Sequence, residues 1–355
     1  MRGDSQDSGQ QISWSFLLAE DDDAKLALES VGSAVSLVDG TRIDKLHEAR
    51  HESLPTPPAS TRSDHSPDIS LNASEVELYN HIFGAFYSRP LTIPNTSVSA
   101  TLSYCDSILR ISQRFSITPL ISTQLSTALK SHRHEFYVAI SGDPARYLLL
   151  SIQLKDTSIY TESLIHIIGV WPCWPLRWPT KPSVLPAELS KIIKRKATEL
   201  KHLVTYTENE LLKLTIFMHR SGPPNPCNHS EFDTYFVVGH FRDGLANEMT
   251  ALDGERTRNL KRGDFFRKIA KGGDAYMPLA QTRGLMEEVM PSVLGNLDED
   301  WKMLKDSAMV RVEDVAKNRT LVDVEAEKIG WLTCAEIGRG DVLWEMTAEG
   351  SGHDV

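Results

Sequence analysis

The chain has 355 residues, which exceeds the usual size of one domain, so we expect two domains. Hydrophobic residues make up 41% and charged residues 24%, values that are typical of folded globular proteins and exclude a wholly disordered chain. The formal net charge of -10 argues against nucleic acid or an anionic membrane as the main partner, because phosphate binding requires clustered Lys and Arg.

The sequence predicts an intracellular protein, located in the cytoplasm or the nucleus. Its four cysteines lie far apart, without a C-x-x-C pair or the dense framework of small secreted domains, so we expect reduced thiols. Residues 1–11 are polar and lack the basic and apolar regions of a signal peptide. The longest apolar runs are far shorter than the ~20 residues that span a bilayer, so we expect no membrane-spanning segment.

Residues 1–24 are predicted to form a flexible acidic tail. They are rich in Ser, Gln, Asp and Gly and end in the acidic run Glu20-Asp21-Asp22-Asp23. Trp14 and residues 16–18 interrupt this polar composition. They represent either a short docking segment or an edge element that covers the module that follows.

Residues 25–135 are predicted to form a small mixed α/β module. Alternating hydrophobic residues beside Asp39-Gly40 indicate a hairpin, and residues 69–71 indicate a further short strand. Between these, the Pro- and Ser-rich stretch at about 54–67 is typical of an exposed loop. Apolar side chains at spacings of three and four then predict three helices, over about 74–87, 98–115 and 119–130.

Residues 136–345 are predicted to form a mainly α-helical domain, followed by a flexible tail at 346–355. The longest predicted helix, over 186–218, has an apolar face and an opposite basic face that either binds an acidic partner or is simply solvated. Residues 329–332 indicate a short strand or helix. The other helices are expected at 136–140, 145–154, 158–168, 232–252, 263–271, 287–293 and 298–317. The fold class expected for the whole chain is therefore α+β.

The stretch 171–179 contains three of the seven tryptophans, alternating with prolines. Such a segment is stiff and presents a large aromatic area at a low entropy cost, which suits a protein-binding anchor. Trp171, Trp174 and Trp178 are therefore the candidate protein-binding residues. The alternative is a plug that fills the junction between the two domains, because so much bare apolar surface would favour aggregation.

The sequence contains no complete catalytic, phosphate-binding or metal-binding motif. The sequence has no G-x-S-x-G turn, and the glycines within Lys271–Tyr276 follow a predicted helix, which favours a helix C-cap over a phosphate loop. Cys227, His229 and His240 offer three zinc ligands without a paired spacing. We therefore expect no catalytic residue, no metal and no cofactor; a hydrolase-like enzyme with a site between the two halves remains the alternative.

Three stretches within residues 68–130 resemble the second half of a BTB/POZ domain. They are Asp68-Ile69-Ser70-Leu71, the helix that ends in Phe83-Gly84-Ala85-Phe86-Tyr87 before Arg89-Pro90-Leu91, and Ile108–Ile117 leading to Leu120 and Leu125. The whole chain is similar to fungal BTB-domain-containing proteins of uncharacterised role, in which stretches like 160–166 and 272–278 recur.

This resemblance implies a non-enzymatic adaptor or scaffold that binds a protein, with self-association or a cullin-type ligase as the partners of a complete BTB domain. Residues 35–67 depart from the family pattern, because they contain neither the His-x-x-x-Leu helix entry nor the Ser-Pro-x-Phe segment. This departure therefore puts in doubt the dimer interface and the cullin-binding surface that a complete BTB domain would imply.

Overall fold

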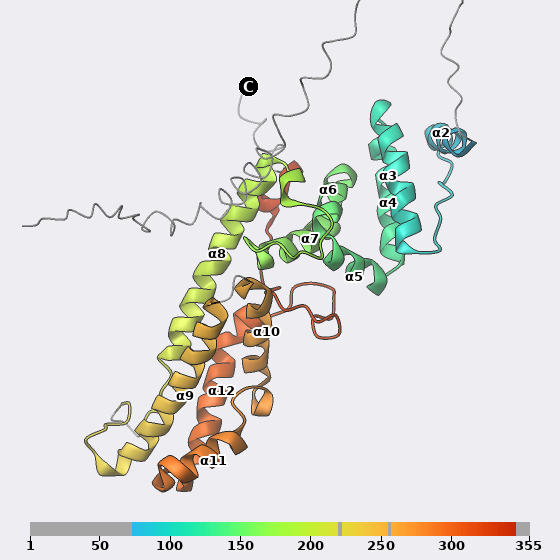
Figure 1. Cartoon of the computed structure of the whole chain (residues 1–355). Coiled ribbons are helices and arrows are strands. Elements are labelled where there is room, and N and C mark those ends of the chain that lie inside the picture. The colour runs from blue at the N-terminus through green and yellow to red at the C-terminus, as the bar shows by residue number, and fades with distance from the viewer. Residues whose placement is uncertain (1–72, 219–221, 255–256, 346–355) are drawn as a thin grey trace, which may run out of the picture. The chain divides into compact units, whose positions relative to one another are not determined.

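The computed structural model describes residues 73–218, 222–254 and 257–345, which all belong to one unit, Ser70–Val355 (Figure 1). Within these residues the regular structure is helical and contains no strand. The predicted α+β fold, with a mixed α/β module over 25–135, is therefore wrong for the described part of the chain. The strands and the loop predicted before residue 72, and the tails at 1–24 and 346–355, lie outside the described residues.

The first three helices confirm the periodicity in the sequence. They are α2 (Ala73–Phe86), α3 (Val98–Arg114) and α4 (Thr118–Ser131). The side-chain oxygen of Ser97 accepts a hydrogen bond from the backbone nitrogen of Ala100 and so caps the start of α3. Helices α3 and α4 bury most of their apolar faces in a smaller hydrophobic core, which also includes residues from α5, α6 and the first turn of α7. Helix α2 buries only Ile82 and Ala85 in this core, and Phe83 and Phe86 of its predicted apolar face are exposed.

Helix α7 is buried on nearly every side. It follows α5 (His134–Gly142) and α6 (Pro144–Leu154) and spans Thr157–Val170. The Asp156 carboxylate caps its first turn by accepting from two backbone nitrogens, and the same carboxylate pairs with Lys130 at 2.7 Å. Since the eleven residues from 159 to 170 other than Thr161 are all buried, α7 serves as the central element against which later segments pack.

Four further helices contribute to a second, larger hydrophobic core, which also contains buried residues of α6, α7 and the C-terminal segment. In Figure 1, α8 (Ala187–Leu212), α9 (His229–Asp253) and α12 (Leu297–Ala316) lie side by side, and α10 (Arg258–Lys271) packs on α12. The predicted apolar face of the long helix is confirmed, since Leu189, Ile193 and Leu211 are fully buried. The helix predicted at 287–293 is instead α11 (Leu279–Val289), followed by a 3-10 turn at Pro291–Gly295.

The segment 317–345 runs without an α-helix apart from its last residues, and contains one 3-10 turn at Arg339–Asp341. The strand or helix predicted at 329–332 does not form. These residues are buried because they lie between helices, and their backbone groups bond to helix residues in place of a neighbouring strand: the Gly330 oxygen accepts from the Asp264 nitrogen at 2.9 Å. Two further 3-10 turns span Pro182–Val184 and Gly273–Ala275.

Candidate functional site

An open groove of about 940 Å³ lies where three segments of the chain meet. Its walls are the Trp- and Pro-rich loop after α7, the helix α10, and the part of the C-terminal segment from 324 to 331. We call it the α10 groove. The lining residues are Trp174, Pro175, Leu176, Arg177, Thr257, Leu260, Lys261, Asp264, Arg267, Lys268, Lys271, Ala275, Val324, Glu325, Lys328, Ile329, Gly330 and Trp331.

The three candidate tryptophans occupy different places around this groove. Trp174 lines it, and the indole N–H of Trp174 donates to the carbonyl oxygen of Thr180 at 3.1 Å. Trp178 is fully buried behind it and donates its indole N–H to the carbonyl oxygen of Ser141 at 2.9 Å. Trp171 is half-buried against the larger core. A role of these side chains in partner binding stays a prediction, and only Trp174 among them belongs to the groove lining.

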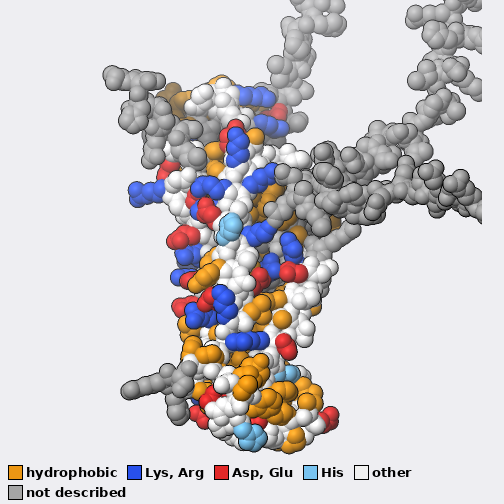
Figure 2. Space-filling view, turned by 90° about the vertical axis from the view of Figure 1, so that its left-hand side faces the viewer, with side chains coloured by type: hydrophobic (Ala, Val, Ile, Leu, Met, Phe, Trp, Pro, Cys, Tyr) orange, Lys and Arg blue, Asp and Glu red, His pale blue; other side chains and the backbone are white. Residues whose placement is uncertain are grey.

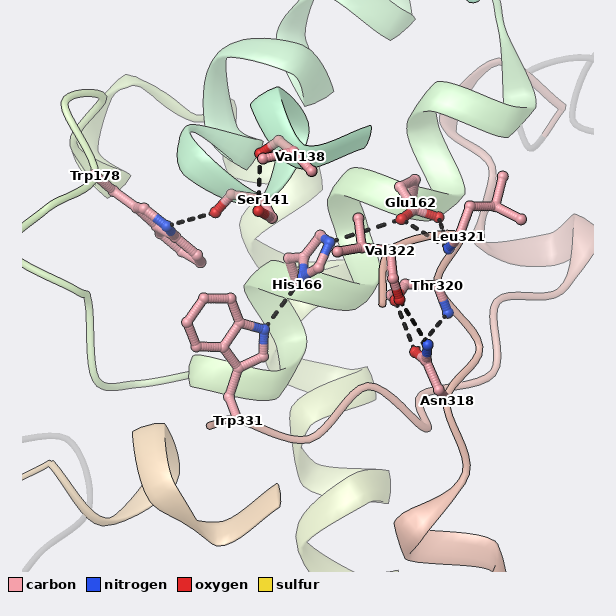
Figure 3. A network of polar contacts seen from close by, with 10 residues as sticks. All are labelled: Val138, Ser141, Glu162, His166, Trp178, Asn318, Thr320, Leu321, Val322 and Trp331. Carbon is pink, nitrogen blue, oxygen red and sulfur yellow. Dashed lines mark hydrogen bonds and ion pairs between the residues drawn. The ribbon is translucent and has the colours of Figure 1, made fainter. Parts of the chain in front are cut away.

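Trp331 forms the floor of the groove, and Figure 3 shows what holds it there. Its indole N–H donates to Nδ1 of the fully buried His166 at 3.2 Å. The ring of Trp178 meets that of Trp331 edge to face, with centroids 5.6 Å apart. Trp331 is therefore oriented by residues of α7 and by the loop after it.

A carboxylate on α7 fixes the start of the same C-terminal segment. Both oxygens of the buried Glu162 accept from the backbone nitrogen of Leu321, at 3.0 and 3.1 Å, and Nε2 of His166 lies 3.7 Å from Oε1 of Glu162 (Figure 3). Asn318 adds a turn, because its Oδ1 accepts from the Thr320 nitrogen and its amide donates to the Val322 carbonyl. The chain that leads to this wall of the groove is thus anchored to the buried Glu162.

Helix α10 supplies the opposite wall and most of the charge. The Arg267 guanidinium donates to the carbonyl oxygens of Trp331 and Ile329, which ties this wall to the floor. Burial lowers the pKa of Arg267, an effect that the nearby Asp264 and Glu325 carboxylates oppose. Arg267 therefore acts as a structural cross-link between α10 and the C-terminal segment.

The groove has a charge opposite to that of the chain. Six Lys or Arg side chains and two Asp or Glu side chains line it, a surplus of four positive charges, in a chain of formal charge -10. Lys268 pairs with Asp264 at 2.9 Å and Lys271 with Glu325 at 2.8 Å. The positive surplus is therefore a property of this groove and not of the whole surface.

The basic face predicted for α8 is partly paired with carboxylates. Figure 2 shows Lys and Arg side chains intermixed with Asp and Glu along the face of the molecule that it presents. Arg195 pairs with Glu199 and Asp341, and Lys196 pairs with the same two carboxylates. Neighbouring carboxylates thus offset part of the charge on this helix.

The zinc-ligand candidates lie just before α9, at its start and within it, and Cys227 and His229 are exposed. Asn228 caps α9, and His240, whose pKa is lowered by burial, stacks on Trp301 with centroids 5.9 Å apart. No group of three or more His, Cys, Asp or Glu among the described residues could hold a metal ion, so the zinc hypothesis for Cys227, His229 and His240 gains no support. Gly272, with φ 63°, ends α10 as predicted for a C-cap.

Of the three segments that line the groove, only the Trp- and Pro-rich loop contains residues that the sequence singled out as candidates for binding. The Trp- and Pro-rich loop was recognisable by its composition, but Leu260 and Lys261 look like ordinary helix positions, and Lys328 looks like an ordinary loop residue. The only signal for the floor was the apolar stretch that contains Trp331. Nothing local indicates that segments so far apart in the chain meet.

Comparisons with protein-family models, curated proteins and solved structures found no match for this chain. The resemblance to fungal BTB/POZ proteins, and the self-association or cullin-type ligase that it implies, therefore stay predictions. Among the described residues, no helix combines the length and apolar character that are needed to cross a bilayer.

Proposed function

We propose that this chain acts inside the cell as a non-enzymatic adaptor or scaffold, and that it binds an extended segment of a partner protein in the α10 groove. The observation that carries the proposal is the composition of this groove. Apolar and aromatic surface from Trp174, Leu176 and Leu260 alternates with charged side chains in an open channel, a combination that is typical of peptide-binding sites.

The rigidity of the walls also supports peptide binding. The floor residue Trp331 is hydrogen-bonded to a buried histidine, and Arg267 links the floor to α10. A site that is already ordered loses little conformational entropy when a ligand binds. Leu176 is 97% exposed beside this rigid floor, so it offers apolar surface that a partner can cover.

The lining of the groove gives no support to the alternative of a hydrolase-like enzyme. Within the described residues its lining contains no Ser, Cys or His side chain, so it presents no nucleophile beside an imidazole base. An enzyme of the hydrolase type thus has no specific observation in its favour at this site.

Site-specific photo-crosslinking tests the proposal. A benzoylphenylalanine at position 176 of the full chain is expected to crosslink to a discrete partner protein in a lysate of cells that naturally express this chain. The same probe at position 310, which is 67% exposed on α12 and outside the groove, serves as the control. The partner is then purified and its Kd for the chain is measured.

Leu176→Asp should raise that Kd at least about tenfold, whereas Leu120→Ala, an exposed leucine on α4, should leave it unchanged. Because Leu176 is exposed, its substitution should change the free energy of unfolding by less than about 0.5 kcal/mol. Equal crosslinking at both positions, or an unchanged Kd for Leu176→Asp, would contradict binding in the α10 groove.

A further inference from the structure

Two cations on different walls of the α10 groove form no ion pair with any residue in the described ranges. They are Arg177 in the Trp- and Pro-rich loop and Lys328 in the C-terminal segment, and both are exposed. The Arg177 guanidinium lies over the Trp331 ring, 5.0 Å from its centroid. The N–H groups of this guanidinium make no hydrogen bond to any other described residue, so they stay available to a carboxylate.

The backbone holds Lys328 at the rim of the groove. Its φ of 51° lies in the left-handed region, and hydrogen bonds on both sides close the turn: the Lys328 nitrogen donates to the Glu325 carbonyl at 3.2 Å, and the Ile329 nitrogen donates to the Val324 carbonyl at 2.8 Å. These two backbone hydrogen bonds therefore fix the position of Lys328 within the turn.

We propose that the partner segment is acidic: carboxylates of the peptide pair with Arg177 and Lys328, while an apolar side chain between them contacts Leu176 and Leu260. This inference rests on the proposed function and adds the chemistry of the ligand. Charge complementarity carries it, because the groove has four more positive than negative side chains within a chain of net charge -10.

The composition of the walls favours an acidic peptide over a nucleic acid. A phosphate backbone needs an uninterrupted row of cations, whereas Asp264 and Glu325 stand within this groove and already pair with Lys268 and Lys271. The apolar surface of Leu176 and Leu260 has no counterpart on a phosphate chain. A peptide with alternating acidic and apolar residues matches both features.

Selection from a phage-displayed library of random peptides tests the inference on the immobilised full chain. The peptides have about 12 residues, or roughly 40 Å when extended, which is long enough to reach both walls. We expect the selected pool to be enriched in Asp and Glu flanking Leu, Phe or Trp. Binding of a selected peptide should weaken at least about tenfold between about 50 and 500 mM salt.

Charge reversal locates the site. The double variant Arg177→Glu/Lys328→Glu should raise the Kd of the selected peptides at least about thirtyfold. The matched control Lys191→Glu/Lys194→Glu has the same change in net charge at two exposed positions of α8 outside the groove, and should change it less than about threefold.

The outcomes separate the two proposals. A pool of neutral or basic peptides that bind less tightly to Leu176→Asp would overturn acidic recognition and keep the groove as a peptide site. A pool that is unaffected by Leu176→Asp, or no selected pool, would overturn both. Tighter binding of a single-stranded oligothymidine than of the selected peptides would overturn the acidic-peptide inference in favour of nucleic acid.

Discussion

Asp341 shows how single polar residues hold the C-terminal segment in place. Its side chain is buried and accepts from the Gly338 nitrogen at 2.8 Å, from Lys196 at 3.2 Å and from Arg195. Its backbone carbonyl accepts a hydrogen bond from the hydroxyl of Tyr160. Burial raises the pKa of this hydroxyl to about 12. One residue thus bonds to groups on α7, on α8 and within its own turn, and it secures the chain beyond the groove.

The Asp341 carboxylate should make stability depend on pH. Burial raises its pKa, but the hydrogen bond from Gly338 and the charges of Lys196 and Arg195 outweigh burial, so its pKa lies below the ordinary value. Because the pKa of this carboxylate is lower in the folded than in the unfolded chain, its ionised form stabilises the fold above about pH 4. This stabilisation is lost as the pH falls through the folded-state pKa.

We therefore expect Asp341→Asn to lower the free energy of unfolding by about 1–3 kcal/mol at pH 7. Denaturant titrations at several pH values should show the difference from the unsubstituted chain shrinking below about pH 4. Asp314→Asn, at an exposed position on α12, is the control and should have little effect at any pH. A pH-independent loss for Asp341→Asn would contradict the electrostatic explanation.

At the scale of elements, an irregular part of the C-terminal segment packs directly between α7 and α10. It lies so close to α7 and α10 that only glycine fits at the contacts. A Cβ at Gly169 of α7 would lie 1.9 Å from the Leu332 oxygen, and one at Gly263 of α10 would lie 2.1 Å from the Trp331 oxygen. These two glycines allow the backbone that contains Trp331 to pass between the helices.

Gly263→Ala should therefore destabilise the protein, although alanine favours helix formation. The expected loss is about 2–3 kcal/mol, because the added methyl group overlaps backbone atoms that cannot rotate away. Gly284→Ala on α11, where no atom lies within 4 Å of the added Cβ, should instead raise the free energy of unfolding by about 0.5–1 kcal/mol. Urea denaturation measures both, and a neutral Gly263→Ala would refute the close packing.

At the scale of the described unit, two hydrophobic clusters meet in one short helix. In α6, Ala145 and Leu148 belong to the larger cluster, while Tyr147, Leu150 and Leu154 belong to the smaller one. Helices α2, α3 and α4 reach the rest of the unit mainly through α5 and α6. This arrangement favours partly independent opening of the smaller cluster, because few apolar contacts would have to break.

Hydrogen exchange should detect this division. Leu125→Ala, at a fully buried position of the smaller cluster, is expected to cost about 2–5 kcal/mol and to speed amide exchange in α2–α4 while α9 and α12 stay protected. Leu245→Ala, the matched change in the larger cluster, should speed exchange in α9 and α12. Uniform acceleration in both variants would mean that the unit opens as one cooperative body.

The periodic helices could be predicted from sequence, because amphipathic spacing is a local property. The long helix with Leu189, Ile193 and Leu211 on its buried side is the clearest case. The α+β fold class was wrong for the described residues, whose regular structure is helical without a strand, while the strands predicted before residue 72 lie outside them. The apolar run at 329–332 was misread as well, since burial between two helices produces the same hydrophobic signal as a buried strand.

The sequence by itself determined the helical periodicity, the acidic net charge and the aromatic loop at 171–179, because these depend on neighbouring residues or on composition alone. Only the tertiary structure decided where those features act. The α10 groove joins segments separated by up to about 160 positions, and its charge appears only when Arg177, the lysines of α10 and Lys328 line the same channel. Contacts at such separations depend on how the whole core packs, which no local pattern specifies.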